Sequence, residues 1–311
     1  MTVLLATRMG AVEQAQWLSL LQAALPEEHF VTTRDATTDL QIDIAVVANP
    51  PPAALRNLPN LRFIQSLWAG VETLLSDATV PAEIPLARMV DPAMSTAMAE
   101  TALWAVLSLH RGYFECAAQQ VQRRWQSVPQ PRADEVSLAV LGLGQMGRAV
   151  ATRLVQAGYR VSAWSLNAAT LEGVQTAHGD NALQQVLAAA NIVVNLLPLT
   201  AATRCILNAH TFVQMRPDAS LVNLARGAHV VDADLLAALN SGHLKRAVLD
   251  VFHTEPLPAD HPFWTHPQVT VLPHVAAQTD PRSAVQVAAS NITSHRAGGQ
   301  VQHLVNRHAG Y

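Results

Sequence analysis

Arginine, carboxylate and histidine side chains stand directly after apolar runs in the second half of this 311-residue chain. Arg226, Asp250, Glu255 and His274 all lie at or just beyond the end of such a run. The runs are Leu221–Leu224, Ala247–Val251 and Val269–Leu272. In open α/β sheets, ligands bind beyond the carboxyl ends of the strands, so these side chains can converge although they are far apart in sequence.

Three of these side chains could together bind a small acid and move a proton. Arg226 can hold a carboxylate through a two-pronged charge-assisted pair, a geometry that lysine does not match. His274 can give a proton to a carbonyl oxygen or take it back. Glu255 can bond the other ring nitrogen, orient the imidazole and favour its protonated form.

A glycine-rich stretch, Val136–Ser165, precedes these residues. It begins with an apolar run, continues with a G-x-G-x-x-G motif and a helical pattern, and closes with a second apolar run at Tyr159–Trp164. Strand, glycine-rich turn, helix and strand within about thirty residues are the context of a dinucleotide-binding βαβ unit. The sequence therefore predicts that Val136–Ser165 binds a dinucleotide.

Each glycine of the motif has a separate physical task. Gly142 allows a tight turn out of the strand, and Gly144 lets the backbone approach a pyrophosphate. Gly147 lets the helix pack close to the sheet. Gln145 and Met146 begin that helix, whose unpaired N–H groups and partial positive charge attract phosphates.

The four polar residues at the strand ends also have structural interpretations. Arg226 could form a salt bridge, Asp250 could cap a turn, and Glu255 and His274 could be ordinary loop residues. Their order and placement behind a dinucleotide motif favour the chemical interpretation. An arginine, a carboxylate and a histidine beside a dinucleotide indicate hydride transfer to a 2-oxo acid.

Composition narrows the class of protein further. Half of the residues are hydrophobic and 14% are charged, and the length fits two domains. The net charge of −3 argues against nucleic acid as the main partner. No apolar run reaches membrane-spanning length, and the N-terminus does not read as a signal peptide. Two cysteines, Cys116 and Cys205, form no framework, so we expect a cytoplasmic protein without a metal site.

A repeated strand-then-helix rhythm predicts an α/β protein with parallel sheets and helices on both faces. We expect a helix capped by Asp91 that carries Leu103, Val106, Leu107 and Phe114 on one side. We expect another helix at Asp232–Leu239 with Asp232 as its cap, and a last one from Asp280 to about Arg296. The remaining strands are expected at Val3–Ala6, Ile42–Ala48, Leu61–Gln65, Ile84–Met89 and Ile192–Leu196.

These residues carry a resemblance over essentially the whole chain. The chain resembles the D-isomer-specific 2-hydroxyacid dehydrogenases through its glycine motif, Asn223–Gly227, Leu249–Phe252 with Glu255-Pro256, and Pro273-His274. Within that family it is similar to the glyoxylate/hydroxypyruvate reductase A group. The features shared with that group are Trp68–Val71, Asn195–Pro198, His274–Ala277 and the ending Gly310-Tyr311.

The resemblance implies roles for individual residues. The catalytic residues would be Arg226, Glu255 and His274. The substrate would be bound by Trp68, Ala69 and Gly70 together with Arg226 and His274. Backbone N–H groups near Ala69 and Gly70 would bind its carboxylate. Asp250 would face the nicotinamide carboxamide, and Leu197 and Pro198 would line the adenosine side.

The resemblance also implies an architecture of two Rossmann-like or flavodoxin-like parallel-sheet domains with the active site in a cleft between them. Residues 1–94 and 278–311 would form the substrate-binding domain, and 95–277 an inserted dinucleotide-binding domain. Members of this family are usually homodimers. The implied reaction is reduction of a small 2-oxo acid, glyoxylate or hydroxypyruvate, to glycolate or D-glycerate.

One position departs from the pattern of an NAD site. Enzymes selective for NAD place an acid about twenty residues beyond the glycines, where it binds the ribose 2′-hydroxyl. Ser165 takes that position here and is followed by Leu166 and Asn167, whereas the reductase A group places arginines there. The missing acid favours NADPH, and the missing arginines leave NADH possible.

Other interpretations are open to the same residues. A β-hydroxyacid dehydrogenase would use a lysine, but Lys245 is the only lysine and stands before a strand. A zinc site would draw on His253, His261, His266 or His274, without the tight spacing of zinc ligands. A reductase for a bulkier 2-oxo acid, or a non-catalytic protein that senses dinucleotides, stays an alternative.

Overall fold

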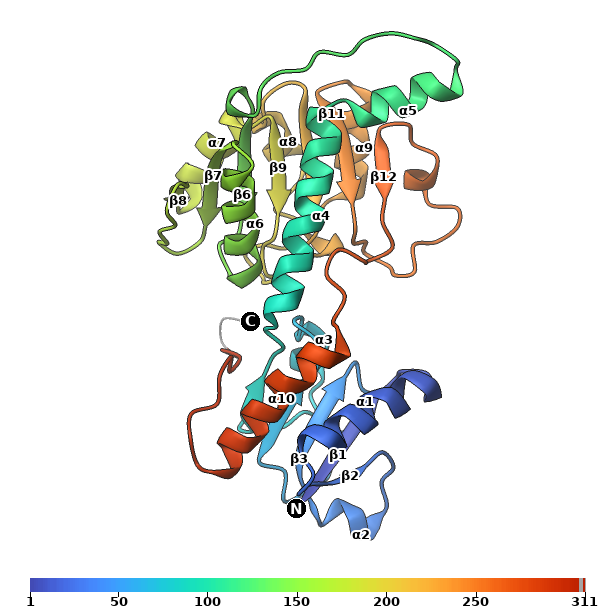
Figure 1. The fold of residues 1–311 in the computed structure, drawn as a ribbon, viewed down its shortest axis with the longest axis vertical. Helices are drawn as coiled ribbons and strands as arrows, with labels where there is room; N and C mark the ends of the chain where they lie inside the picture. Colours follow the sequence, from blue (N-terminus) through green and yellow to red (C-terminus); the bar gives the residue numbers. More distant parts are fainter. Residues whose placement is uncertain (308–309, 311) are drawn as a thin grey trace. The chain divides into compact units, whose positions relative to one another are not determined.

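The computed structural model describes residues 1–307 and 310, so Tyr311 lies outside the described residues. The chain divides into two compact units, one formed by Met1–Ala93 with Thr279–Tyr311 and the other by Met94–Gln278. The second unit is thus inserted into the first along the sequence. Each unit has its own sheet (Figure 1).

The first unit is built on a five-stranded parallel sheet of order β2-β1-β3-β4-β5. Its strands are β1 (Thr2–Thr7), β2 (His29–Val31), β3 (Ile42–Ala48), β4 (Phe63–Ser66) and β5 (Leu86–Ala87). Its helices are α1 (Ala11–Ala24), α2 (Ala36–Asp39), α3 (Glu72–Ser76) and α10 (Pro281–Arg296). The central strands are buried on both faces, which is why they read as nearly continuous apolar runs.

The C-terminal helix α10 returns to this first sheet and packs beside α1 (Figure 1). Asp280 caps it, accepting a hydrogen bond of 2.9 Å from the Arg282 N–H. Asn291 donates to the buried Gln65 at 2.9 Å, and Arg296 bridges Glu28 and Asp43. The contacts of Asn291 and Arg296 thereby bind α10 to the N-terminal part of this unit.

The second unit contains a seven-stranded parallel sheet of order β12-β11-β10-β9-β6-β7-β8. Its strands are β6 (Ser137–Leu141), β7 (Arg160–Ser165), β8 (Gln175–His178), β9 (Ile192–Asn195), β10 (Ala219–Asn223), β11 (Leu244–Leu249) and β12 (Val269–Val271). The order reverses between β6 and β9. Ligands of doubly wound sheets bind at the carboxyl ends of the strands beside such a reversal.

Helices cover both faces of this second sheet (Figure 1). They are α4 (Pro92–His110), α5 (Tyr113–Val121), α6 (Gln145–Gln156), α7 (Asp180–Ala189), α8 (Ala209–Gln214) and α9 (Asp232–Asn240). Alternate strand residues face opposite sides, so Val140 packs with α4 and α6, whereas Leu141 packs with α7, α8 and α9. The predicted α/β class with helices on both faces is confirmed.

Two local predictions are wrong. The helix that begins at Pro92 ends at His110, because Gly112 adopts a left-handed conformation with φ of 67°. Phe114 therefore belongs to a separate helix, and Leu107 is exposed. Asp232 is the first residue of α9 rather than its cap, and its carboxylate lies toward His253 and His261 instead.

No helix in the described part of the chain is long and apolar enough to cross a membrane.

Candidate active site

The glycine-rich turn between β6 and α6 is tightly packed against its surroundings. Gly142 has φ of 97°, and a Cβ there would meet the Leu196 carbonyl oxygen at 2.7 Å. A Cβ on Gly147 would lie 1.9 Å from the carbonyl oxygen of Gly142. Only glycine fits either position, so the motif folds as a turn that brings α6 onto the sheet.

The same turn presents an open surface suited to a phosphate. Gly144 is exposed, and a Cβ built there meets nothing within 4 Å. Gln145 and Met146 follow as the first residues of α6, where backbone N–H groups have no intrahelical partner. A pyrophosphate fits this combination of space, N–H groups and positive helix end.

The strand after this helix, β7, ends at Ser165 in the position of the missing acid. The Ser165 hydroxyl donates to the Asn167 carbonyl oxygen at 2.7 Å. The adjoining Leu166 and Asn167 are exposed. A hydroxyl here leaves room for a 2′-phosphate that a carboxylate would repel.

A buried polar network joins the turns that follow β9 and β10. The side chains of Asn195, Asn223 and His229 are fully buried, and Asn195 Nδ2 lies 2.9 Å from Asn223 Oδ1 and 3.0 Å from His229 Nδ1. His229 Nε2 approaches the Pro198 carbonyl oxygen at 3.2 Å, and Asn223 donates to the Arg226 carbonyl oxygen at 3.1 Å. The network thereby fixes Leu197-Pro198 and the backbone of Arg226 relative to each other.

The turn carrying Arg226 also packs directly on the loop that carries Glu255. A Cβ on Gly227 would lie 2.0 Å from the Phe252 carbonyl carbon, so only glycine allows this approach. The Arg226 guanidinium donates to the Ala225 carbonyl oxygen at 2.7 Å and is partly exposed. Its positive charge adds to the lowering of the pKa of Glu255 and opposes the raised pKa of His274, in both cases as a smaller effect than the hydrogen bond between those two side chains.

Glu255 and His274 form a direct pair. His274 Nδ1 donates to Glu255 Oε2 at 2.7 Å, and Glu255 Oε1 accepts from the Phe252 N–H at 2.9 Å. The hydrogen bond to Glu255 raises the pKa of His274, although burial and the Arg226 charge oppose it. Burial raises the pKa of Glu255, but the hydrogen bonds from His274 and Phe252 outweigh it and the pKa is lowered.

Asp250 holds the turn on which His274 stands. Its two carboxylate oxygens accept from the N–H groups of Val275, at 2.8 Å, and Ala276, at 3.0 Å, while its carbonyl oxygen accepts from His274 at 2.9 Å. These bonds accompany the left-handed backbone of His274, with φ of 54°. Burial raises the pKa of Asp250, with the two N–H bonds opposing the shift. Its contact with a carboxamide stays a prediction.

The other residues expected to bind substrate belong to the first unit. Trp68, Ala69 and Gly70 follow the carboxyl end of β4 and are partly exposed. Ser66 fixes this turn, since its hydroxyl contacts both the N–H and the carbonyl oxygen of Trp68 at 3.0 Å. Met89 donates to the same carbonyl oxygen at 3.0 Å. These hydrogen bonds fix the backbone of Trp68, which directly precedes Ala69 and Gly70.

The residues of the alternative chemistries have other contacts. Lys245 pairs with Glu115 at 2.8 Å at the start of β11, so it has a structural partner. His253 and His261 flank Asp232 at 3.8 and 3.5 Å. Within residues 1–307 and 310, no group of three or more histidine, cysteine, aspartate or glutamate side chains could hold a metal ion.

Comparison with known proteins matches this fold and site to a family. The model of the D-isomer specific 2-hydroxyacid dehydrogenase NAD binding domain matches residues 103–276. Glyoxylate/hydroxypyruvate reductase A of Yersinia enterocolitica is 38% identical over 304 residues, covering 96% of this chain and 97% of that one.

Solved structures agree over the whole length. The D-isomer specific 2-hydroxyacid dehydrogenase of Xanthobacter autotrophicus, in complex with NADPH and MES, superposes with a TM-score of 0.93 at 37% identity and covers 100% of this chain and 99% of its own. The NADPH-dependent glyoxylate/hydroxypyruvate reductase of Sinorhizobium meliloti, in complex with NADP and sulfate, gives a TM-score of 0.92 at 32% identity with the same coverage.

Fold and site together define an oxidoreductase of the dinucleotide-dependent class. The chain belongs to the D-isomer-specific 2-hydroxyacid dehydrogenase family. Its relatives are glyoxylate/hydroxypyruvate reductases. The resemblance stated from the sequence is confirmed.

Proposed function

We propose that this protein reduces a small 2-oxo acid with NADPH, glyoxylate or hydroxypyruvate being its substrates and glycolate or D-glycerate its products. The observation that carries the proposal is the His274–Glu255 pair, 2.7 Å apart, with Arg226 beside it at the carboxyl edge of the seven-stranded sheet. The relatives that share this fold from end to end include NADPH-dependent reductases of these two acids.

The chain's own residues supply binding and proton transfer. Gly144, Gln145 and Met146 would hold the pyrophosphate, Leu197 and Pro198 would flank the adenosine, and the bound nicotinamide would supply the hydride. Arg226 binds the substrate carboxylate, which leaves the carbonyl oxygen for the imidazole. His274 gives that oxygen the proton from Nε2, because Nδ1 is engaged by Glu255.

The two units divide these tasks under the proposal. The glycine motif and the three catalytic side chains all lie within Met94–Gln278, whereas Trp68, Ala69 and Gly70 lie in the other unit. We therefore assign dinucleotide binding to residues 95–277 and part of substrate binding to 1–94 with 278–311. We also assign the backbone N–H groups of Ala69 and Gly70 to binding of the substrate carboxylate.

A substrate panel tests this function. Purified protein is assayed with glyoxylate, hydroxypyruvate, pyruvate and bulkier 2-oxo acids, with NADPH and NADH side by side. We expect the highest kcat/KM with one of the first two acids and NADPH. Preference for a bulky acid would redefine the substrate, and tight NADPH binding without turnover of any 2-oxo acid would overturn the enzymatic function.

The pH profile gives a prediction specific to the Glu255 carboxylate. Reduction needs protonated His274, so its rate falls as the pH rises through the pKa of His274. Because the hydrogen bond to Glu255 raises that pKa, the Glu255→Gln variant should lose activity at a lower pH than the wild type. Initial rates of reduction between pH 5.5 and about 9.5, a range chosen around the ordinary histidine pKa, measure the shift. An unchanged alkaline limb would remove Glu255 from this role.

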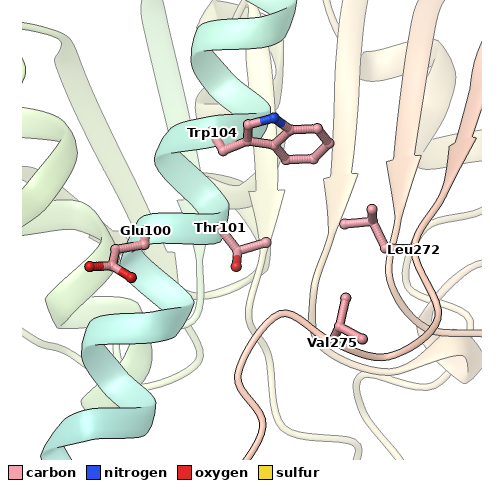
Figure 2. Close-up of a pocket in the computed structure, with 5 residues that line it drawn as sticks. All are labelled: Glu100, Thr101, Trp104, Leu272 and Val275. Carbon is pink, nitrogen blue, oxygen red and sulfur yellow. The ribbon is translucent and has the colours of Figure 1, made fainter.

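We also propose that the protein is a homodimer, since its second unit carries an exposed apolar surface. On α4, Trp104 is 40% and Leu107 41% exposed, and Trp125 after α5 is fully exposed. Figure 2 shows Trp104 and Thr101 directed toward Leu272 and Val275, with which they and Glu100 line an open pocket of about 350 Å³. Trp104 and Leu107 lie one helical turn apart on α4, and an exposed apolar patch of this kind marks a protein interface.

The Trp104→Arg variant should therefore be monomeric. A charged side chain cannot be buried at an apolar interface without a partner, whereas it is readily solvated on a free monomer. Size-exclusion chromatography with light scattering measures the mass of the variant and of the wild type. The control is Val213→Arg on α8, which changes another exposed apolar residue and should leave the mass unchanged. A monomeric wild type would refute the proposed dimer.

We also propose that the protein is cytoplasmic, because its cysteines are unpaired thiols. Cys116 and Cys205 are both free, as is usual in a reducing compartment.

A further inference from the structure

The segment after β7 raises the question of what binds a 2′-phosphate in this chain. Position 165, where an acid would mark an NAD site, is a serine, and Leu166 and Asn167 carry no charge. A phosphate monoester carries a charge of about −1.5 to −2 near neutral pH, and its binding favours a cation with several N–H donors. That cation has to come from another element of the fold.

Arg148 reaches this segment from the phosphate-binding helix. It directly follows Gly147, the third glycine of the motif, in the first turns of α6. Its Nη1 donates to the Thr170 carbonyl oxygen at 2.9 Å, five residues beyond Ser165. The guanidinium therefore lies between the pyrophosphate end of α6 and the loop that leaves β7. This bond uses one of its five N–H donors, and the side chain is partly exposed.

A second donor stands next to Ser165 on the edge strand β8. His178 is the residue paired with Ser165 in the parallel ladder, so their side chains share one face of the sheet. That face is the one covered by α6, because Ala163, two residues before Ser165, packs with Val150 and Leu154 of that helix. His178 is exposed, and its imidazole can donate an N–H in either charge state.

We propose that Arg148 is the cation that binds the 2′-phosphate of NADPH, with Ser165 and His178 as additional hydrogen-bond donors. The inference rests on the proposed function, in that it concerns the nucleotide of the same site. It locates the source of NADPH preference on the glycine-rich helix and on β8, instead of on the residues directly after β7. Sequence spacing alone does not show this, because Arg148 and Ser165 are separated by most of α6 and the whole of β7.

Nucleotide binding measured without substrate tests the assignment. We expect Arg148→Gln to weaken binding of NADPH about tenfold or more and to leave binding of NADH within about twofold, because a charge-assisted hydrogen bond is lost only with the phosphate. Arg148→Lys, which keeps the charge, should lie between wild type and Arg148→Gln. The matched control is Arg153→Gln, an exposed arginine in the last turn of α6, which should change neither affinity.

A second variant adds a negative charge to the same site instead of removing a positive one. Ser165→Asp places a carboxylate where it repels a 2′-phosphate and accepts from a 2′-hydroxyl, so the ratio of NADPH to NADH affinity should fall. Equal weakening of both nucleotides by Arg148→Gln, or no weakening of either, would overturn the assignment. If the wild-type protein bound neither nucleotide, the proposed function itself would fail. Tight wild-type binding of NADPH with an unaffected Arg148→Gln would remove only the role of Arg148.

Discussion

Replacing His274 by asparagine should lower kcat for reduction of a 2-oxo acid by about 10²- to 10⁴-fold, the usual contribution of a general acid. Asparagine suits the test because His274 has φ of 54°, and asparagine tolerates this left-handed conformation better than alanine does. Because the amide has no titrating proton, the variant cannot donate one to the carbonyl oxygen. NADPH affinity should stay within about twofold, since the pyrophosphate and the 2′-phosphate are bound elsewhere.

A control histidine separates this effect from general damage. His210→Ala on α8 changes an exposed side chain that contacts only Gln214 among the hydrogen bonds of the described residues, and it should keep the wild-type rate. Steady-state kinetics and nucleotide binding on the three proteins provide the comparison. Near-native turnover by His274→Asn would mean that another group donates the proton.

Replacing Arg226 by glutamine should act first on the substrate carboxylate. Loss of a two-pronged charge-assisted pair removes two hydrogen bonds to a charged group, so kcat/KM for the 2-oxo acid should fall by about 10²-fold or more. Arg226→Lys should recover part of this loss, because lysine keeps the charge but not the forked geometry. Affinity for NADPH should not change.

The Arg226 variant has a second readout with a definite sign. The Arg226 charge lowers the pKa of His274, so its removal should raise that pKa and move the alkaline limb of the reduction profile to higher pH. This is the opposite direction to the shift expected for Glu255→Gln. A pH profile of Arg226→Gln that moves in the acid direction, or a kcat/KM near the wild-type value, would contradict the placement of Arg226 beside substrate and imidazole.

Much of the site can be predicted from the sequence, because ligands of open α/β sheets bind at the carboxyl ends of the strands. Parallel strands end at the same edge, so Arg226, Glu255 and His274 could be grouped from three separate apolar runs. The motif glycines could be assigned in the same way, since a turn with φ of 97° at Gly142 and the contact of Gly147 with Gly142 are demands of the backbone. The fold class followed from the alternation of strands and helices.

Other features depend on contacts that no local pattern contains. Gly227 is required by the backbone of Phe252, and Asn223 is required by Asn195 and the Arg226 carbonyl oxygen, all through space. The sequence does indicate that Asn195 and Asn223 have hydrogen-bond partners, because polar residues at the ends of apolar strands must be hydrogen-bonded when they are buried. The break at Gly112 and the contact of Arg148 with Thr170 were not apparent from the sequence, since both depend on how neighbouring segments pack.

Under the proposed function, this chain uses NADPH to reduce a small 2-oxo acid, with His274 as the proton donor. The most direct measurement incubates the purified protein with NADPH and hydroxypyruvate, follows NADPH oxidation and resolves the product by chiral chromatography. We expect one D-glycerate to form for each NADPH consumed, and the His274→Asn variant to lose this product. NADPH that stays bound and unoxidised in the presence of hydroxypyruvate, glyoxylate and the bulkier 2-oxo acids would contradict the proposed function.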